Sequence, residues 1–256
     1  MTYDRQTVFH RLVAAARNAD AMLALWESGS AVFGRTDQYS DIDLEALIAP
    51  GQLEAVVGLL RTALAAIAPI SHEYRQQLSQ GDTQFFWQLT GASPFNFVDL
   101  TLTAWQGQPL RLGAHGEGRP IVHFDKPGCL NIQEETASEM ELRVRQRLRE
   151  IAAIWEFHPR LVEKHIRRGH ILAAYGQYQR LLIGPLIDLL RIKHCPQRSS
   201  WQTTYITWDL PVEIQKRLVP LVMVSSLGQM EANLPAIATW GRELIHELES
   251  GPLGHG

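Results

Sequence analysis

The chain contains 256 residues, of which 45% are hydrophobic and 20% are charged, and its formal net charge is −3. This is the composition of a globular protein with a packed core, long enough for one large domain or two small ones. Proteins that grip long nucleic acids usually carry a surplus of basic residues, so the acidic balance disfavours a nucleic-acid partner.

Cysteine usage and hydropathy indicate the compartment. The two cysteines, Cys129 and Cys195, lie far apart in the sequence, which is typical of a reduced cytosolic protein. No apolar run approaches the length of a membrane-spanning helix, and the N-terminus lacks the pattern of a signal peptide. A cytoplasmic protein with no membrane contact is therefore expected.

In the first half of the chain, helical periodicity alternates with short apolar runs. Two segments have apolar residues at helical spacing and predict helices, at residues 5–19 and 53–67. Six short apolar runs bounded by turn residues predict strands, at residues 21–27, 42–48, 70–75, 84–89, 96–103 and 121–124. The fifth run has apolar residues at both parities, which predicts that both of its faces are covered. A glycine-rich turn is predicted at residues 113–118.

After residue 130 the periodicity is helical almost to the end. Asn131 is predicted as an N-cap, with Glu134 three residues on, for a helix that ends at His158-Pro159. Further helices are predicted at residues 160–183, 186–194, 211–226 and 229–249. The expected fold is therefore α+β, with a catalytic domain at residues 1–130 and an all-helical domain at residues 131–256.

One segment combines a phosphate-type turn with two acids. Gly29-Ser30 follows an apolar run, and Asp41-x-Asp43 opens the next one. A Gly-Ser turn lets the backbone approach a phosphate closely, and its hydroxyl and exposed N–H groups can cradle that phosphate. Alternate residues of a strand point the same way, so Asp41 and Asp43 project together. Two such carboxylates repel each other, and Mg²⁺, which prefers oxygen ligands shared with substrate phosphates, relieves the repulsion.

This pattern resembles the signature of the polymerase-β-like nucleotidyltransferase superfamily, a Gly-Ser followed after a spacer by Asp-x-Asp. The Ser-Asp-Ile-Asp-Leu run that ends at Leu44 is similar to the small-molecule branch, which includes the aminoglycoside and lincosamide adenylyltransferases. The resemblance covers residues 21–103 and implies a mixed sheet with flanking helices, paired with a helical domain. It implies an enzyme that transfers a nucleoside monophosphate, AMP from ATP or its equivalent from another NTP, to a hydroxyl group of a small molecule. An aminoglycoside-like antibiotic is the acceptor that it suggests.

The resemblance also implies roles for single residues. The family needs a third carboxylate on a neighbouring strand, and Asp99, an acid within an apolar run, fits that position. Asp41, Asp43 and Asp99 are accordingly expected to be catalytic and to bind Mg²⁺ or Mn²⁺, one ion activating the acceptor hydroxyl and one holding the triphosphate. The residue that takes the acceptor's proton is left open between Asp99, Glu45 and Glu73.

Other residues are expected to bind the nucleotide. Gly29, Ser30 and Arg35 would contact the triphosphate. Arg191 and Lys193 close an apolar helix, where basic residues suit the helix dipole. These two residues of the helical domain are predicted to neutralise the β- and γ-phosphates of the nucleotide.

Two other functions stay open at this stage. The chain could be a degenerate or antitoxin-type module that acts on or binds a protein partner, and transfer of nucleotides to tRNA is disfavoured by charge. Because some relatives build their active site across two subunits, a homodimer is a further expectation.

Overall fold

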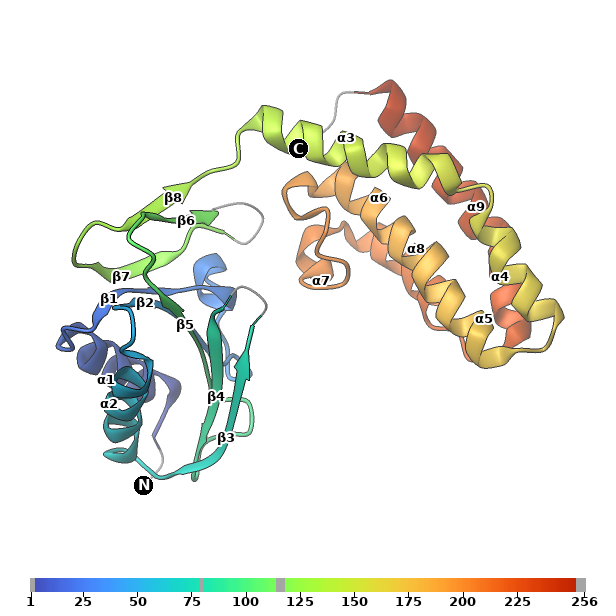
Figure 1. The fold of residues 1–256 in the computed structure, drawn as a ribbon. Helices are drawn as coiled ribbons and strands as arrows, with labels where there is room; N and C mark the ends of the chain where they lie inside the picture. The colour runs from blue at the N-terminus through green and yellow to red at the C-terminus, as the bar shows by residue number, and fades with distance from the viewer. Residues whose placement is uncertain (1–2, 79–80, 114–117, 252–256) are drawn as a thin grey trace. The chain divides into compact units, whose positions relative to one another are not determined.

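The computed structural model describes residues 3–78, 81–113 and 118–251. The chain divides into two compact units, Met1–Glu134 and Glu135–Gly256, close to the boundary predicted at residues 130 and 131. The first unit is a mixed sheet flanked by helices and the second is helical, which confirms the α+β class (Figure 1). No helix within the described ranges is long and apolar enough to cross a membrane. Both cysteines are buried and free.

The first unit is built on a six-stranded sheet with the order β3-β4-β5-β2-β1-β7. Its strands, all of them predicted, are β1 (Met22–Glu27), β2 (Ile42–Ile48), β3 (Ile70–Gln77), β4 (Thr83–Leu89), β5 (Val98–Ala104) and β7 (Ile121–Asp125). Strands β2 and β5 run parallel to each other, whereas the other neighbouring strands of this sheet are antiparallel. The predicted turn at residues 113–118 lies largely outside the described residues.

Two helices cover one face of this sheet, α1 (Arg5–Arg17) and α2 (Leu53–Ala65), as predicted (Figure 1). Beneath them, β4 and β5 alternate between buried and half-buried residues. In β5, Val98 and Leu100 are buried on the helix side, while Asp99 and Thr101 lie on the other side. The prediction that both faces of this strand are covered is therefore wrong. We call the side that carries Asp99 the helix-free face.

Two short strands escaped the sequence analysis. β6 (Leu110–Gly113) and β8 (Leu130–Gln133) form a separate parallel pair, whose leucines pack against part of the helix-free face around Trp26. Asn131, predicted as an N-cap, lies inside β8. The capping box is instead formed by Thr136 and Glu139, each of which accepts a hydrogen bond from the other's backbone N–H.

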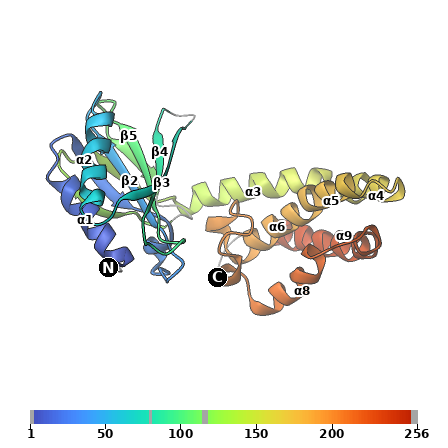
Figure 2. The same ribbon diagram turned by 90° about the horizontal axis from the view of Figure 1, so that it is seen from below.

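The second unit packs around one apolar core (Figure 2). Its helices are α3 (Ala137–Ile154), α4 (His158–Arg167), α5 (Ile171–Tyr178), a π-helical turn (Gln179–Ile183), α6 (Gly184–His194), α7 (Ile206–Asp209), α8 (Val212–Val222) and α9 (Leu227–Ser250). Pro159 does not end a helix as predicted, because it lies in the first turn of α4, where its missing N–H is tolerated. Gly169, with a φ of 70°, separates α4 from α5 and divides the helix predicted at residues 160–183.

Candidate active site

The three predicted aspartates meet at one end of the helix-free face. Asp43 on β2 and Asp99 on β5 are direct partners in the parallel register, so both side chains project from the same face. Asp41 precedes Asp43 by two positions. The start of β2 is fixed on β5 by a hydrogen bond of 2.9 Å from the backbone N–H of Ile42 to the carbonyl of Phe97. The structure therefore brings Asp99 to the sequence neighbours Asp41 and Asp43, and the catalytic role of the three stays a prediction.

Burial and mutual repulsion make this acidic cluster unfavourable without a cation. Burial, reinforced by the charges of Asp41 and Asp99 and by a hydrogen bond with Asp41, raises the pKa of Asp43 to about 7, although the charge of Arg5 opposes the shift. The pKa of Asp99 is also raised, first by burial and also by the charge of Asp41. Gln84 opposes that shift, because its Nε2 donates a 2.7 Å hydrogen bond to the Oδ1 of Asp99.

The predicted phosphate turn touches the acidic cluster. Gly29 has a φ of 63°, and a Cβ added to it would lie 1.9 Å from the Oδ2 of Asp43. Only glycine allows the backbone this close to the carboxylate. The hydroxyl of the next residue, Ser30, is buried and has no hydrogen-bond partner within the part of the chain that the structure describes. A polar group in this state is available to a ligand atom.

Arg35 belongs to the same turn. Its backbone N–H donates a 3.0 Å hydrogen bond to the carbonyl of Ser30, and its guanidinium lies 5.1 Å from the ring centroid of Phe33. Gly29, Ser30 and Arg35 therefore form one local segment, the short 3-10 helix Gly29–Phe33 and the turn that follows it. Contact of these three residues with a triphosphate remains a prediction.

A buried ion pair behind the aspartates escaped the sequence analysis. Arg5 of α1 donates a 2.8 Å hydrogen bond from its Nε to the backbone carbonyl of Asp41 and a second of 2.8 Å to the Oε1 of Glu27. Glu27, at the end of β1, is 6% exposed. The sequence did contain a signal for Glu27, because an acid directly after the apolar run 22–26 is unusual and needs a partner when it is buried. Arg5 gave no signal, because its partners are distant in the sequence.

The structure separates two of the residues proposed to accept the acceptor's proton. Glu45 follows Asp43 on the helix-free face and lines a small cavity of about 180 Å³ together with Asp43 and Asp99. Glu73 of β3 is the register partner of Trp87, which is buried in the core beneath the helices, and its carboxylate is bound by Arg61 of α2. Glu73 therefore lies on the opposite face of the sheet, away from the aspartates.

The donor chemistry of this cluster fits a hard divalent cation. Within the described ranges, no group of three or more His, Cys, Asp and Glu side chains is already arranged to hold a metal ion. Magnesium usually takes only one or two protein carboxylates and completes its coordination with water and substrate phosphates. Asp43, with Asp41 or Asp99, provides such carboxylates beside a tight turn whose Ser30 hydroxyl has no hydrogen-bond partner among the described residues. These residues therefore fit Mg²⁺ or Mn²⁺ bound together with a nucleotide.

The nucleotide-binding role predicted for Arg191 is wrong. The Arg191 side chain is fully buried, and it donates 2.7 Å hydrogen bonds to the carbonyl of Gln202 and to the carboxylate of Asp209, and a further one to the carbonyl of Thr204. These bonds fix the loop between α6 and α7. Lys193 differs, because its side chain is one-third exposed and pairs at 2.7 Å with Glu247 of α9. A phosphate contact of Lys193 stays a prediction.

Replacing Arg191 is therefore expected to damage stability rather than nucleotide binding. Arg191→Met should lower the free energy of unfolding by about 1–3 kcal/mol, because the carbonyls of Gln202 and Thr204 lose their donor, whereas Asp209 keeps Arg198 as a second partner. Lys193→Met, two residues away, should change it by less than about 1 kcal/mol. Urea unfolding followed by circular dichroism measures both. An Arg191→Met protein of unchanged stability that had lost nucleotide affinity would restore the original prediction.

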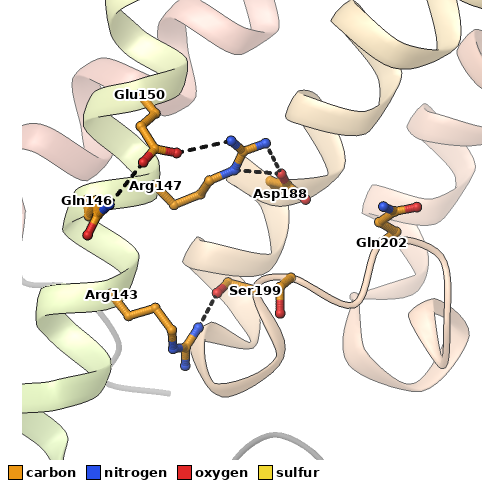
Figure 3. Close-up of a pocket in the computed structure, with 8 residues that line it drawn as sticks. Arg143, Gln146, Arg147, Glu150, Asp188, Ser199 and Gln202 are labelled. Carbon is orange, nitrogen blue, oxygen red and sulfur yellow. Dashed lines mark hydrogen bonds and ion pairs between the residues drawn. The ribbon is translucent and has the colours of Figure 1, made fainter. Parts of the chain in front are cut away.

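A larger cavity lies in the helical unit (Figure 3). It measures about 400 Å³, and its charged groups are paired, Arg147 with Asp188 and Glu150 of the lining and Arg143 with Glu135 outside it. The Nε and a terminal nitrogen of Arg147 donate to the Oδ2 of Asp188 at 2.9 and 2.7 Å, while Arg143 donates to the hydroxyl of Ser199 at 2.6 Å. This cavity lacks the crowded like charges of the aspartate cluster. Size alone therefore does not identify it as the site of the chemistry.

Comparison with known proteins gives little further support. No protein-family model matches the chain, and neither does any curated protein. An aminoglycoside 6-adenyltransferase structure from Bacillus subtilis aligns with a TM-score of 0.37 and 12% identity, covering 97% of this chain and 91% of that one. A spectinomycin adenyltransferase from Enterococcus faecialis, solved with ATP and spectinomycin, aligns with a TM-score of 0.28 and 11% identity, covering 96% of this chain and all of that one. Both TM-scores are too low to assign an activity, so function is inferred from the site itself.

Proposed function

We propose that the chain is a metal-dependent nucleotidyltransferase. It transfers a nucleoside monophosphate, AMP from ATP by the motif resemblance, to a hydroxyl group of a small molecule in the cytoplasm and releases pyrophosphate. One observation carries the proposal: the backbone of Gly29 lies against Asp43, which is the direct register partner of Asp99. A tight turn of the phosphate-binding type and a cluster of mutually repelling carboxylates are thereby joined at one point, which is the combination that metal-assisted phosphoryl chemistry uses.

Each residue has a separate task in this proposal. Mg²⁺ or Mn²⁺, when bound, would neutralise the triphosphate and make the acceptor hydroxyl more acidic. Asp41 and Asp43 would hold that charge in place, and the Gly29-Ser30 turn would bind phosphate oxygens. The acceptor oxygen forms a bond to the α-phosphorus while the bond from that phosphorus to the bridging oxygen of pyrophosphate breaks. The hydroxyl proton passes to Asp99, because burial raises the pKa of this carboxyl and makes it a stronger proton acceptor than an ordinary aspartate.

Substitution of the three acidic candidates tests the assignment of the proton acceptor. Asp99→Asn is expected to lower kcat by roughly 10²–10⁴-fold, the usual contribution of general base catalysis together with a metal contact. Glu73→Gln should stay within about twofold of the wild type, because the carboxylate of Glu73 is bound by Arg61 on the other face of the sheet from the aspartates. Single-turnover rates from pH 5 to 9 make the comparison. If Glu45→Gln were the only one of these variants to lose the rise of the rate with pH, Glu45 rather than Asp99 would be the proton acceptor.

Calorimetric titration tests the proposed function itself. ATP, GTP, CTP and UTP are titrated, with and without Mg²⁺, into the wild type and into an Asp41→Asn/Asp43→Asn double variant. Metal-dependent binding of an NTP that is lost in the variant is expected, and it names the donor for a mass-spectrometric search for nucleotidylated acceptors. Absence of binding for every NTP would contradict the proposal. It would favour a degenerate module, which should then co-purify with a protein partner.

A further inference from the structure

Aromatic side chains occupy the helix-free face beside the aspartates. Tyr74 of β3, Phe86 of β4 and Phe97, which directly precedes β5, line a cavity of about 280 Å³ that we call the aromatic pocket. The ring centroids of Tyr74 and Phe86 lie 6.2 Å apart, and those of Phe86 and Phe97 lie 6.0 Å apart. Tyr74 is exposed, and Phe86 and Phe97 are half-buried. The open face of a sheet normally carries polar residues, so this group of rings marks a binding surface.

The aromatic pocket lies beside the acidic cluster on the same face of the sheet. Phe86 is the register partner of Asp99, so the two side chains project from adjacent strands on the same face. Phe97 adjoins Asp41, because its carbonyl accepts the hydrogen bond from the backbone N–H of Ile42. Neighbouring strands lie about 4.8 Å apart, so the pocket extends from about 5 to 10 Å from Asp99 along the sheet.

The strand order places this pocket on the acceptor side of the reaction. The Gly29 turn follows β1, and the sheet then continues through β2 with Asp43, β5 with Asp99, β4 with Phe86 and β3. In an in-line displacement the entering and leaving oxygens lie on opposite sides of the phosphorus. With the pyrophosphate at the turn beside β1, the acceptor approaches from β4 and β3.

We propose that the aromatic pocket binds a planar, apolar ring of the acceptor, which is therefore a ring-bearing alcohol or phenol. This inference rests on the proposed nucleotidyl transfer. Aromatic side chains favour stacked or edge-on contact with such a ring. A polycationic aminosugar fits less well. Among the described residues that line the pocket, Glu73 is the only acid, and its carboxylate is held by Arg61 towards the helix-covered face.

The experiment uses 2-naphthalenemethanol as the probe, with Mg²⁺ and a non-hydrolysable ATP analogue present. Its Kd is measured by ligand-observed NMR on the full chain. Tyr74→Ala is the main variant, because Tyr74 is 57% exposed and its removal does not threaten folding. Phe86→Ala is the second. Phe95→Ala is the matched control, because this ring is also half exposed but makes an edge-to-face contact with Tyr39 and does not line the pocket.

Probe binding should weaken about fivefold or more in Tyr74→Ala and in Phe86→Ala, and should stay unchanged in Phe95→Ala. Equal weakening in all three variants, or no binding to the wild type, would overturn the inference. The inference would also be overturned if Tyr74→Ala abolished the binding of an aminoglycoside but left the Kd of the naphthyl probe unchanged. Calorimetry of the Mg-nucleotide alone separates the two proposals. Intact nucleotide binding with a failed probe rejects the acceptor class only, and absent nucleotide binding rejects the proposed activity.

Discussion

Asp43→Asn is expected to abolish nucleotidyl transfer and, at the same time, to stabilise the metal-free protein above neutral pH. The loss of transfer, at least about 10²–10³-fold, follows from removing a charge that acts on the reacting phosphate. The gain in stability follows from removing the repulsion between neighbouring carboxylates. The ionised Asp43 is buried beside Asp41 and Asp99, which is why its pKa is raised to about 7. The neutral amide relieves that repulsion.

The sign of the pH dependence follows from linkage. Because the pKa of Asp43 is higher in the folded protein than in the unfolded chain, the folded protein retains a proton that the unfolded chain has released. Stability is therefore lost as the pH rises from about 4 to about 7. The full shift corresponds to ~4 kcal/mol, and partial exposure of the carboxyl reduces the expected effect to ~1–2 kcal/mol.

Thermal unfolding at pH 5 and pH 8, with and without Mg²⁺, measures this effect. At pH 8 without metal, Asp43→Asn should have a higher Tm than the wild type, and the difference should shrink at pH 5. Mg²⁺ should raise the Tm of the wild type and not that of the variant. Asp82→Asn, at the edge of β4, is the control and should match the wild type in both respects. An Asp43→Asn protein that is less stable at pH 8 would contradict the repulsion described here.

Gly29→Ala is expected to reduce transfer by about 100-fold or more. The added Cβ would lie 1.9 Å from the Oδ2 of Asp43, so either the turn or the carboxylate must move. A displacement of about 1 Å at a reacting centre is enough for a loss of this size. The affinity for Mg-nucleotide should fall as well, because the same backbone is expected to face the phosphates.

Gly34→Ala separates this contact from backbone strain. Gly34 has a φ of 62°, almost identical to the 63° of Gly29, but a Cβ added there would meet no atom within 4 Å. Both variants should lose about 1–2 kcal/mol of stability from the left-handed conformation. Only Gly29→Ala should also lose activity. Steady-state kinetics and urea unfolding of the pair provide the test, and equal activity in the two variants would show that the close approach is unimportant.

The aspartate cluster was accessible to sequence reasoning because its signals are local. Alternation within a strand placed Asp41 and Asp43 together, and an acid inside an apolar run pointed to Asp99. The register that makes Asp43 and Asp99 direct partners could not be predicted, since it depends on how two distant segments pair. Arg5 escaped for the same reason, because its hydrogen bonds reach Asp41 and Glu27 through tertiary packing alone.

The errors have a common physical origin. A basic residue at the end of a helix can interact with the helix dipole, bind a ligand or form a buried ion pair. The sequence does not show which of these three roles Arg191 has. Its partner Asp209 lies beyond a loop whose path is not encoded in any periodic pattern. Likewise β6 and β8 have four residues each and little burial, so their apolar residues gave no strand signal. Asn131 was then mistaken for the start of the helix that Thr136 begins.

The hairpin of β3 and β4 is inserted in the chain between the two strands that carry the carboxylates, and β3 forms the edge of the sheet. Residues on this edge can change without disturbing the pairing of β2 with β5. Sequence changes in this hairpin would therefore alter the acceptor substrate while leaving the phosphoryl chemistry intact. Homologues that diverge in function are accordingly expected to differ most around Tyr74 and Phe86, and least around Asp43 and Asp99.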